Sequence, residues 1–333
     1  MDRGLSEFEL IDRLRRQSSA TGPLVTGLGD DASVTVHPGP TATSVDAVVE
    51  GVHFRRQWSD PTRIARKAVA VALSDLAAMA ADPGEIYVTL GLPPDTGAGW
   101  LEQLADGFFE VAREFGATLA GGDTVASPVL FVAVTVVGRA AEGERFILRN
   151  GAAEGDLVAA TGCFGGAAAG LILLEREGSS GAGEPGPDTD VRAGLIGRHV
   201  SPRPLLAAGS RLRGSAVSAL IDVSDGLAAD LGHVADASGV GISIDAGLVP
   251  VQPGVQEVAS LVGRDPMDLA LAGGEDYELA MTVRPDGIEA VRSDLEEVGC
   301  RLTVVGSVAS GNAVTVSGIG GDGSPPSGFD HFR

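Results

Sequence analysis

Short acidic motifs within apolar, glycine-rich segments constrain this chain more than any other feature of its sequence. Each motif has an Asp or Glu beside Gly, Ser or Thr, with flanks apolar enough for a protein core. They lie at Gly27–Ala32, Ser44–Phe54, Ser74–Asp75, Gly121–Thr124, Asp222–Gly226 and Gly273–Asp276. An isolated charge is expensive to bury, and two carboxylates about 4 Å apart repel by about 4 kcal/mol at an effective dielectric constant near 20. The pattern therefore predicts a cation that compensates these charges.

The donor chemistry of the motifs favours one class of cation. They offer carboxylate and hydroxyl oxygens, which are typical ligands of hard divalent ions and above all of Mg²⁺. A single Asp beside Gly is more often a turn residue or a helix cap, so the argument depends on the number of motifs. Asp75 carries the most weight, because the helix predicted around it has almost no polar face. His53 lies within an acidic motif, but a polar residue at a strand edge is an equally good interpretation.

Length and charge limit the class of protein. A chain of 333 residues is long enough for two domains with separate cores, which we expect to comprise residues 1–148 and 149–333. The net charge of −21 argues against binding to nucleic acid or to an anionic membrane. It is compatible with a phosphorylated substrate if metal ions lie between the carboxylates and the phosphates. Because the sequence has neither a signal segment nor a long apolar run, we expect a cytoplasmic protein.

Several familiar catalytic motifs are missing from the sequence. Lys67 is its only lysine and follows no glycine run, which excludes a P-loop. Gly27 and Gly29 lack the third glycine of a dinucleotide-binding fingerprint, and neither Gly-x-Ser-x-Gly nor HExxH occurs. Cys163 and Cys300 form no zinc-binding spacing. The chemistry that remains is metal-assisted phosphoryl transfer, in which positioning and charge neutralisation dominate.

Strands and helices are predicted to interleave along the chain, which indicates an α/β (α+β) fold. We expect strands over 34–36, 43–49, 85–92, 129–138, 156–161, 219–223, 241–244, 278–283, 302–308 and 313–316. Helices are expected over 5–20, 61–80, 99–115, 167–174, 204–212, 224–237 and 286–298. The Gly121-Gly122 pair is placed between a helix and a strand, where its N–H groups could approach phosphate oxygens. A low-complexity surface loop is expected over 177–190.

Taken together, the motifs resemble those of a known family. GLGDDASV (27–34), SVDAVVEGVHF (44–54), ARKAVAVALSDLAAMAADP (65–83), AGGDT (120–124), IDVSDGLAADLGH (221–233), LAGGEDYELAMTV (271–283) and GFDHF (328–332) resemble thiamine-monophosphate kinases, which belong to the aminoimidazole-ribonucleotide-synthetase-like superfamily. The resemblance implies an N-terminal α/β domain whose strands pair across a homodimer interface, and a C-terminal α/β domain that closes over the nucleotide. It also implies direct in-line phosphoryl transfer from ATP to thiamine monophosphate, which gives thiamine diphosphate.

The same resemblance implies roles for individual residues. A cluster of Mg²⁺ ions would be held by Asp30, Asp31, Ser44, Val45 through its backbone, Asp46, Asp75, Asp123, Asp222 and Asp225, with Asp46, Asp75 and Asp222 central to catalysis. Nucleotide contacts would come from Gly122, Asp123, Arg149 and Ser224, and thiamine phosphate contacts from His53, Glu275 and Phe329. The family often has Thr at the position of Val45 and Tyr at that of Phe329. A backbone ligand tolerates the first difference, and an aromatic face is retained in the second.

Other interpretations make different demands on the sequence. Selenophosphate synthetases need a reactive cysteine or selenocysteine near the N-terminus, whereas the first cysteine here is Cys163. The related hydrogenase-maturation proteins end in a functional cysteine, and this chain ends in His331-Phe332-Arg333. A non-catalytic regulator that binds nucleotide or metal is the alternative from another class. For Phe329, the alternative to a substrate contact is a hydrophobic anchor of the C-terminal tail.

Overall fold

A computed structural model describes residues 23–28, 32–177, 186–319 and 324–329, and the helix expected over residues 5–20 lies outside them. The chain divides into two compact units. The first unit comprises residues 1–76 and 81–145, and the second comprises residues 77–80 and 146–333. Among the described residues, every helix is too short or too polar to cross a membrane.

The first unit is built on one four-stranded sheet and two long helices. Its sheet has the order β3-β6-β4-β5, formed by Thr41–Val49, Phe131–Arg139, Asp82–Leu92 and Thr118–Ala126. A two-stranded ribbon, β1 (Leu24–Thr26) and β2 (Val34–Thr35), precedes it. Helix α2 (Pro61–Ala78) begins as the sequence predicts, because the Asp60 carboxylate accepts the Arg63 N–H at 2.8 Å and Pro61 occupies the first helical position. Helix α3 (Ala98–Glu114) buries Leu104, Phe108 and Val111.

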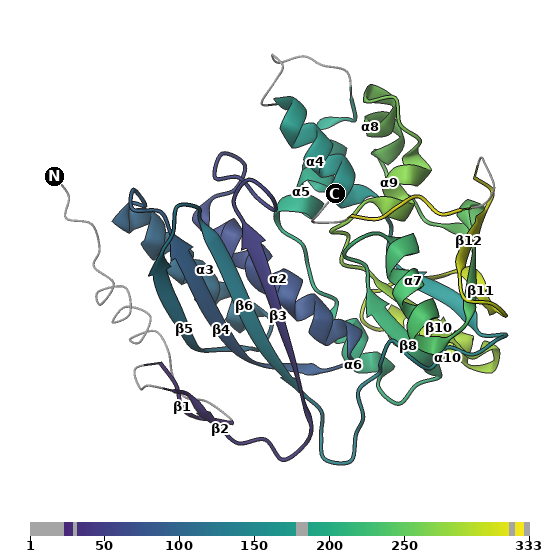
Figure 1. The fold of residues 1–333 in the computed structure, drawn as a ribbon, viewed down its shortest axis with the longest axis horizontal. Coiled ribbons are helices and arrows are strands. Elements are labelled where there is room, and N and C mark those ends of the chain that lie inside the picture. The colour runs from purple at the N-terminus through teal and green to yellow at the C-terminus, as the bar shows by residue number, and fades with distance from the viewer. Residues whose placement is uncertain (1–22, 29–31, 178–185, 320–323, 330–333) are drawn as a thin grey trace. The chain divides into compact units, whose positions relative to one another are not determined.

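The two faces of this sheet differ in how they are covered. Helices α2 and α3 lie on one side of it (Figure 1), and Val132, Val134 and Val136 of β6 are completely buried there. Side chains alternate between the faces of a strand, so Val45 of β3 points to the other face, where it is 66% exposed. No helix of the described residues covers this face, which we call the helix-free face. Val125 of β5 is also exposed, at 42%. An apolar sheet face without a helix layer is a candidate association surface.

Strand β5 corrects the prediction for the Gly121-Gly122 pair. The structure places both glycines in a strand that pairs in parallel with β4, with Gly122 opposite Val88. A Cβ at Gly122 would lie 2.1 Å from the Val88 carbonyl oxygen, so no side chain fits at that position. Glycine is depleted in strands, which is why the sequence pattern did not predict one here.

The second unit is a six-stranded mixed sheet with helices around it. The strand order is β12-β9-β11-β7-β10-β8, and only the β12–β9 pair among these is parallel. The strands are β7 (Leu157–Thr161), β8 (Val217–Asp222), β9 (Gly241–Asp245), β10 (Leu279–Val283), β11 (Leu302–Ala309) and β12 (Val314–Ser317). The helices are α4 (Gly166–Glu177), α5 (Thr189–Val200), α6 (Leu206–Leu212), α7 (Leu227–Ser238), α8 (Val255–Leu261), α9 (Pro266–Ala272) and α10 (Ile288–Glu296). Phe164, Val223 and Leu231 lie in an apolar cluster of this unit.

The predicted fold class is confirmed, and most elements fall where the sequence places them. All the strands and helices expected within the described residues are present, with ends shifted by at most three residues. Helices α5, α8 and α9 were not predicted, and neither were strands β1 and β5. Helices α8 and α9 are only seven residues long, which is too short for a clear helical period in the sequence.

Candidate active site

In the first unit, the structure joins β3 to α2 through two of the predicted ligands. The Ser44 hydroxyl donates a short hydrogen bond to the Asp75 carboxylate. Asp46 lies two residues further along β3 and therefore points to the same, helix-covered face as Ser44. Asp75 is only partly buried, unlike its neighbours Ser74 and Leu76, so this carboxylate opens towards the β3 side of an otherwise apolar helix. Ser44 and Asp75 are thus in contact, and Asp46 points to the same face of the sheet as Ser44.

Asp123 does not point to this face of the sheet. Asp46, Val134, Val88 and Gly122 form one row across the sheet, so Asp123 points to the opposite, helix-free face. Strands β3 and β5 are the two edges of the sheet, and three strand spacings separate them by about 14 Å. Asp30 and Asp31 lie outside the described residues, but Ser33 beside them bonds the Tyr87 hydroxyl of β4 at 2.6 Å. Among the described residues of the first unit, the predicted ligands therefore lie at both faces of the sheet. Ser44, Asp46 and Asp75 lie at the helix-covered face, and Asp123 lies at the other.

The turn after β3 fixes the orientation of His53. The Val49 N–H donates to the Nδ1 atom of His53 at 3.1 Å, so a neutral ring carries its proton at Nε2. Lys67 on α2 donates to the carbonyl oxygen of His53 at 2.7 Å and is 1% exposed. Lys67 therefore supports the turn from inside the protein, and the Val49 N–H orients the His53 ring.

In the second unit, the loop between β8 and α7 carries three predicted site residues. Asp222 ends β8 and is 3% exposed. Ser224 and Asp225 follow it, and Gly226 has a φ of +121° that side chains rarely adopt. A Cβ at Gly226 would also lie 2.7 Å from the Cα atom of Ala272. The sharp turn from strand to helix thus requires glycine immediately after Asp225.

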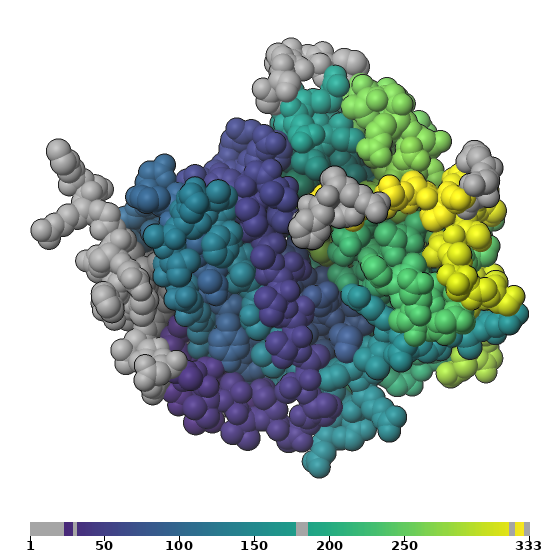
Figure 2. Space-filling view, in the orientation of Figure 1, coloured from purple at the N-terminus to yellow at the C-terminus, as the bar shows by residue number. Residues whose placement is uncertain are grey.

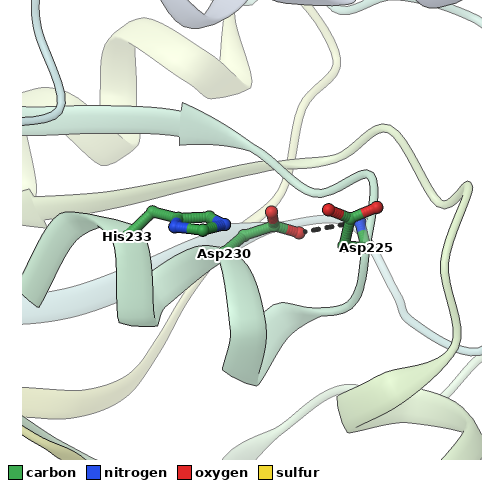
Figure 3. A group of neighbouring side chains, drawn as sticks. All are labelled: Asp225, Asp230 and His233. Carbon is green, nitrogen blue, oxygen red and sulfur yellow. Dashed lines mark hydrogen bonds between the residues drawn. The ribbon is translucent and has the colours of Figure 1, made fainter. Parts of the chain in front are cut away.

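The carboxylate of Asp230, in the first turn of α7, holds this loop. A single oxygen of Asp230 accepts the backbone N–H groups of Ser224, Asp225 and Gly226, at 3.1, 3.0 and 3.1 Å. Burial raises the pKa of Asp230 to about 7, and the Asp222 and Asp225 charges act in the same direction, against the lowering effect of the backbone N–H groups. Figure 3 shows Asp225, Asp230 and His233, whose ligand atoms lie within 4.8 Å of one another. Because Asp230 is bound to the backbone, we regard it as a support rather than as a metal ligand.

The Gly273–Glu278 segment runs beside this loop and is bonded to it. The Glu275 N–H donates to the Ser224 carbonyl oxygen at 2.7 Å, and the Tyr277 N–H donates to that of Val223 at 2.8 Å. Glu275 and Tyr277 both have left-handed backbone, with φ of +65° and +51°, which is uncommon outside glycine. The Nδ1 atom of buried His199 lies 2.8 Å from a carboxylate oxygen of Glu275. The contacts on both sides hold Glu275 next to Ser224 despite the strained backbone.

Asp276, between these two strained residues, anchors the segment to the start of α4. Its two carboxylate oxygens accept the N–H groups of Gly165, at 2.7 Å, and of Ala167, at 3.2 Å. Burial raises the pKa of Asp276 to about 7, whereas the Arg198 charge and the two backbone N–H groups lower it. Arg198 also bonds the carbonyl oxygen of Asp276 and the carboxylate of Glu278, at 3.1 and 2.8 Å.

The C-terminal tail reaches the same loop. The Phe329 N–H donates to the Asp225 carbonyl oxygen at 3.1 Å, and the Phe329 side chain is 52% exposed. Figure 2 shows the tail, in yellow, crossing the surface of the second unit. Glu275 and Phe329, which the resemblance assigns to thiamine phosphate, are therefore both bonded through their backbones to the loop that it assigns to metal and nucleotide.

Arg149 lies elsewhere in the second unit. Its carbonyl oxygen accepts the Ser238 hydroxyl at the C-terminal end of α7, at 3.3 Å. Twelve helical residues separate this end of α7 from the Ser224–Gly226 loop, which corresponds to about 18 Å. The backbone of Arg149 is thus remote from Ser224, and only its long side chain could approach the same ligand.

Four residues were not predicted to support the site: Lys67, His199, Asp230 and Asp276, of which only Asp276 lies in one of the acidic motifs. The signal for Asp230 was present, because this carboxylate lies on the apolar stripe of α7 between Leu227, Leu231 and Val234. A charge on the buried face of a helix indicates a specific partner. Nothing in the sequence identifies that partner as the backbone of the preceding loop.

Comparisons with known proteins show the family of the chain. Two family models match: the N-terminal domain of AIR synthase related proteins over residues 29–140, and their C-terminal domain over residues 153–319. The thiamine-monophosphate kinase of Escherichia coli O157:H7 is 37% identical over 335 aligned residues, which cover 98% of each chain. The chain belongs to the thiamine-monophosphate kinase family.

Solved structures of thiamine-monophosphate kinases also resemble this chain. The crystal structure of thiamine-monophosphate kinase from Stenotrophomonas maltophilia K279a superposes with a TM-score of 0.82 at 35% identity, covering 96% of this chain and 98% of that one. AaThiL, complexed with AMPPCP and TMP, superposes with a TM-score of 0.75 at 29% identity, covering 98% and 97%. The hydrogenase-maturation protein HypE of E. coli, at 22% identity and a TM-score of 0.75, shares the fold.

We predict that the Asp276 carboxylate makes a large contribution to the stability of this family member. In Asp276→Asn, the amide N–H₂ group would face the N–H of Gly165 or Ala167, which leaves a buried donor without an acceptor. We expect the free energy of unfolding to fall by about 1–3 kcal/mol, measured by urea denaturation.

Asp286→Asn is the matched control, because the side chain of Asp286 is 88% exposed. We expect it to change the free energy of unfolding by less than about 0.5 kcal/mol. Equal stability of the two variants would contradict the structural role of Asp276.

Proposed function

We propose that the protein phosphorylates thiamine monophosphate to thiamine diphosphate with ATP as the phosphoryl donor. One observation carries this proposal: Glu275 and Phe329 are bonded through their backbones to Ser224 and Asp225. The residues assigned to the acceptor substrate and those assigned to the nucleotide thus share one loop, as a direct transfer between bound substrates requires. The relatives named thiamine-monophosphate kinase, and AaThiL with bound AMPPCP and TMP, support the same reaction.

Mg²⁺ is the cation that best fits the donor set of the site. Ser44, Asp46 and Asp75 offer only oxygen ligands, as do Asp222 and Asp225, and the last two raise the pKa of Asp230 through their charges. We assign Mg²⁺ to these residues, with Asp30, Asp31, Asp123 and the backbone of Val45 as further ligands. When bound, Mg²⁺ neutralises phosphate charge and so allows two polyanions to approach each other. Asp46, Asp75 and Asp222 are the ligands closest to catalysis in this assignment.

The reaction needs little acid–base chemistry from the protein. An oxygen of the thiamine phosphate, already anionic, attacks the γ-phosphorus of ATP, and the bond from that phosphorus to the β-phosphate oxygen breaks to release ADP. No proton has to be removed from the nucleophile, which explains the lack of a strong general base. His53, whose ring is oriented by the Val49 N–H, is assigned to the acceptor phosphate.

Each of the remaining site residues is assigned to one of the two substrates. Glu275 and Phe329 suit a cationic thiazolium ring, which a carboxylate and an aromatic face both attract. Gly122, Asp123, Arg149 and Ser224 are assigned to ATP, with the Arg149 side chain reaching from the far end of α7. Residues 1–148 would thus carry metal, ATP and dimer contacts, and residues 149–333 would close over nucleotide and substrate.

We further propose a two-fold homodimer that buries the helix-free face of the first unit. Exposed Val45 and Val125 on that face favour association. Asp46 and Asp123 lie on opposite faces and edges of one sheet, so Asp123 meets the ions of Ser44, Asp46 and Asp75 only from a second protomer. We place the reaction in the cytoplasm, and a non-catalytic regulator of the same fold remains the alternative that turnover would exclude.

The direct test of the proposal is turnover. Purified protein with ATP, Mg²⁺ and thiamine monophosphate should form equimolar ADP and thiamine diphosphate, measured by chromatography. Excess EDTA should abolish the reaction and added Mg²⁺ should restore it, because the carboxylates alone repel both substrates. Full activity in EDTA would contradict the metal assignment, and ADP formation without thiamine diphosphate would contradict the acceptor.

A second test concerns Phe329. In Phe329→Ala, loss of stacking and burial worth roughly 1–2 kcal/mol should raise the KM for thiamine monophosphate about 5- to 30-fold, with little change in the KM for ATP. Leu248→Ala is the control, because Leu248 is a 50% exposed apolar side chain of the same unit. An equal loss for both substrates would show that Phe329 is an anchor of the tail.

A third test concerns assembly. Light scattering at micromolar concentration should give twice the 33.6 kDa mass of one chain. Thr135→Arg, on the helix-free face of the central strand β6, should give the monomer mass and lower turnover, because a buried charge opposes association. Glu289→Arg, at a 79% exposed side chain of α10, should leave the dimer intact. A monomeric wild-type protein with full turnover would refute the dimer.

A further inference from the structure

The loop between β8 and α7 has the form of an anion-binding site that the protein fills itself. Consecutive backbone N–H groups that converge at a helix N-terminus commonly bind phosphate. Here the N–H groups of Ser224, Asp225 and Gly226 converge on one oxygen of Asp230, which is 2% exposed. A phosphate group therefore has no access to these donors.

We propose that Asp230 is a positioning residue of the phosphoryl-transfer site. It fixes the backbone of Ser224–Gly226, so that the side chains of Ser224 and Asp225 are available for nucleotide and metal. This inference rests on the proposed function for its consequence in catalysis. Its structural part, the self-filled N–H site, rests on the three hydrogen bonds alone.

Three features of the loop make such a support necessary. The N-cap residue of helix α7 is Gly226, which has no side chain, so the loop before the helix has no side-chain cap of its own. The backbone of Gly226 lies in a region that only glycine adopts readily. The carbonyl oxygens of Ser224 and Asp225 accept the backbone N–H groups of Glu275 and Phe329. Asp230 therefore binds the N–H groups of this loop, and the substrate-binding segments bind its carbonyl groups.

The position of Asp230 also determines how phosphate is held in the site. The N–H groups of Ser224, Asp225 and Gly226 bind the protein's own carboxylate instead of the nucleotide. Nucleotide phosphates must then be bound through Ser224 and through cations on Asp222 and Asp225. An internal carboxylate thus replaces direct phosphate binding by metal-mediated binding.

The first measurement is amide hydrogen exchange in the metal-free wild-type protein. Backbone N–H groups of a loop exchange fast unless a hydrogen-bond acceptor protects them. We expect the Ser224, Asp225 and Gly226 amides to be protected at least tenfold. Fast exchange of all three would overturn the proposal without any variant or any substrate.

The second measurement compares two variants with a control on the same helix. Asp230→Ala removes the acceptor, and we expect loss of the loop protection, at least tenfold lower kcat and at least fivefold weaker Mn²⁺ binding in the presence of a non-hydrolysable ATP analogue. Asp230→Asn keeps an oxygen in place, so its protection, kcat and Mn²⁺ affinity should stay within threefold of wild type. Asp236→Ala, at an exposed carboxylate of α7, should change none of them.

Each alternative outcome has a definite meaning. Wild-type kcat and Mn²⁺ affinity in a folded Asp230→Ala with an exchanging loop would reduce Asp230 to a stabiliser of α7. Equal impairment of Asp230→Asn and Asp230→Ala would show that its charge acts, and would overturn the positioning role. If Asp230→Ala does not fold, amide hydrogen exchange in the wild-type protein and the kcat of Asp230→Asn still test the proposal. Absence of turnover in the wild type would refute the proposed function and leave the exchange result intact.

Discussion

Hydrogen bonds from backbone N–H groups to buried carboxylates are the interaction on which the second unit depends. Asp276 binds the start of α4, and Asp230 binds the loop before α7. Both loops turn sharply at glycine and lack side-chain caps of the usual Ser, Thr or Asn type. A buried carboxylate can accept several N–H groups at once and gains from the helix dipole. The cost of burying each charge is offset only while the loop keeps its conformation, which makes the loops rigid.

The carboxylates around the loop before α7 repel one another, and a bound cation would relieve this repulsion. Asp222 and Asp225 lie near Asp230, and their charges together with burial raise its pKa to about 7. A divalent ion bound to Asp222 and Asp225 would remove this repulsion and lower the pKa of Asp230 again. Metal binding and the hydrogen bonds that hold the loop would then favour each other. The acidic composition of the site is thus consistent with a metal-dependent loop conformation, not with a preformed phosphate pocket.

Sequence reasoning was most successful where periodicity is strong and weakest where backbone geometry decides. The apolar helix α2 and the long strands β4 and β6 follow from their patterns, and the family follows from motifs with fixed spacing. Strand β5 was missed because Gly121 and Gly122 look like a loop, although the close approach of Val88 is the reason for Gly122. Partners such as Asp230 with Ser224, or His199 with Glu275, depend on tertiary contacts between segments. A sequence read alone identifies such residues as chemically unusual but not what they bind.

The topology of the first sheet determines which of the candidate ligands lie on the same face. Antiparallel register places Asp46 with Val134 on the helix-covered face, and parallel register between β4 and β5 places Asp123 with Thr89 on the other. These directions follow from strict side-chain alternation, so no side-chain rotation brings the two carboxylates to one ion. Either Asp123 serves a separate ion, or a second protomer supplies it. Because Val45 and Val125 expose apolar surface on the face that Asp123 shares, the second arrangement accounts for both the position of the carboxylate and the uncovered sheet.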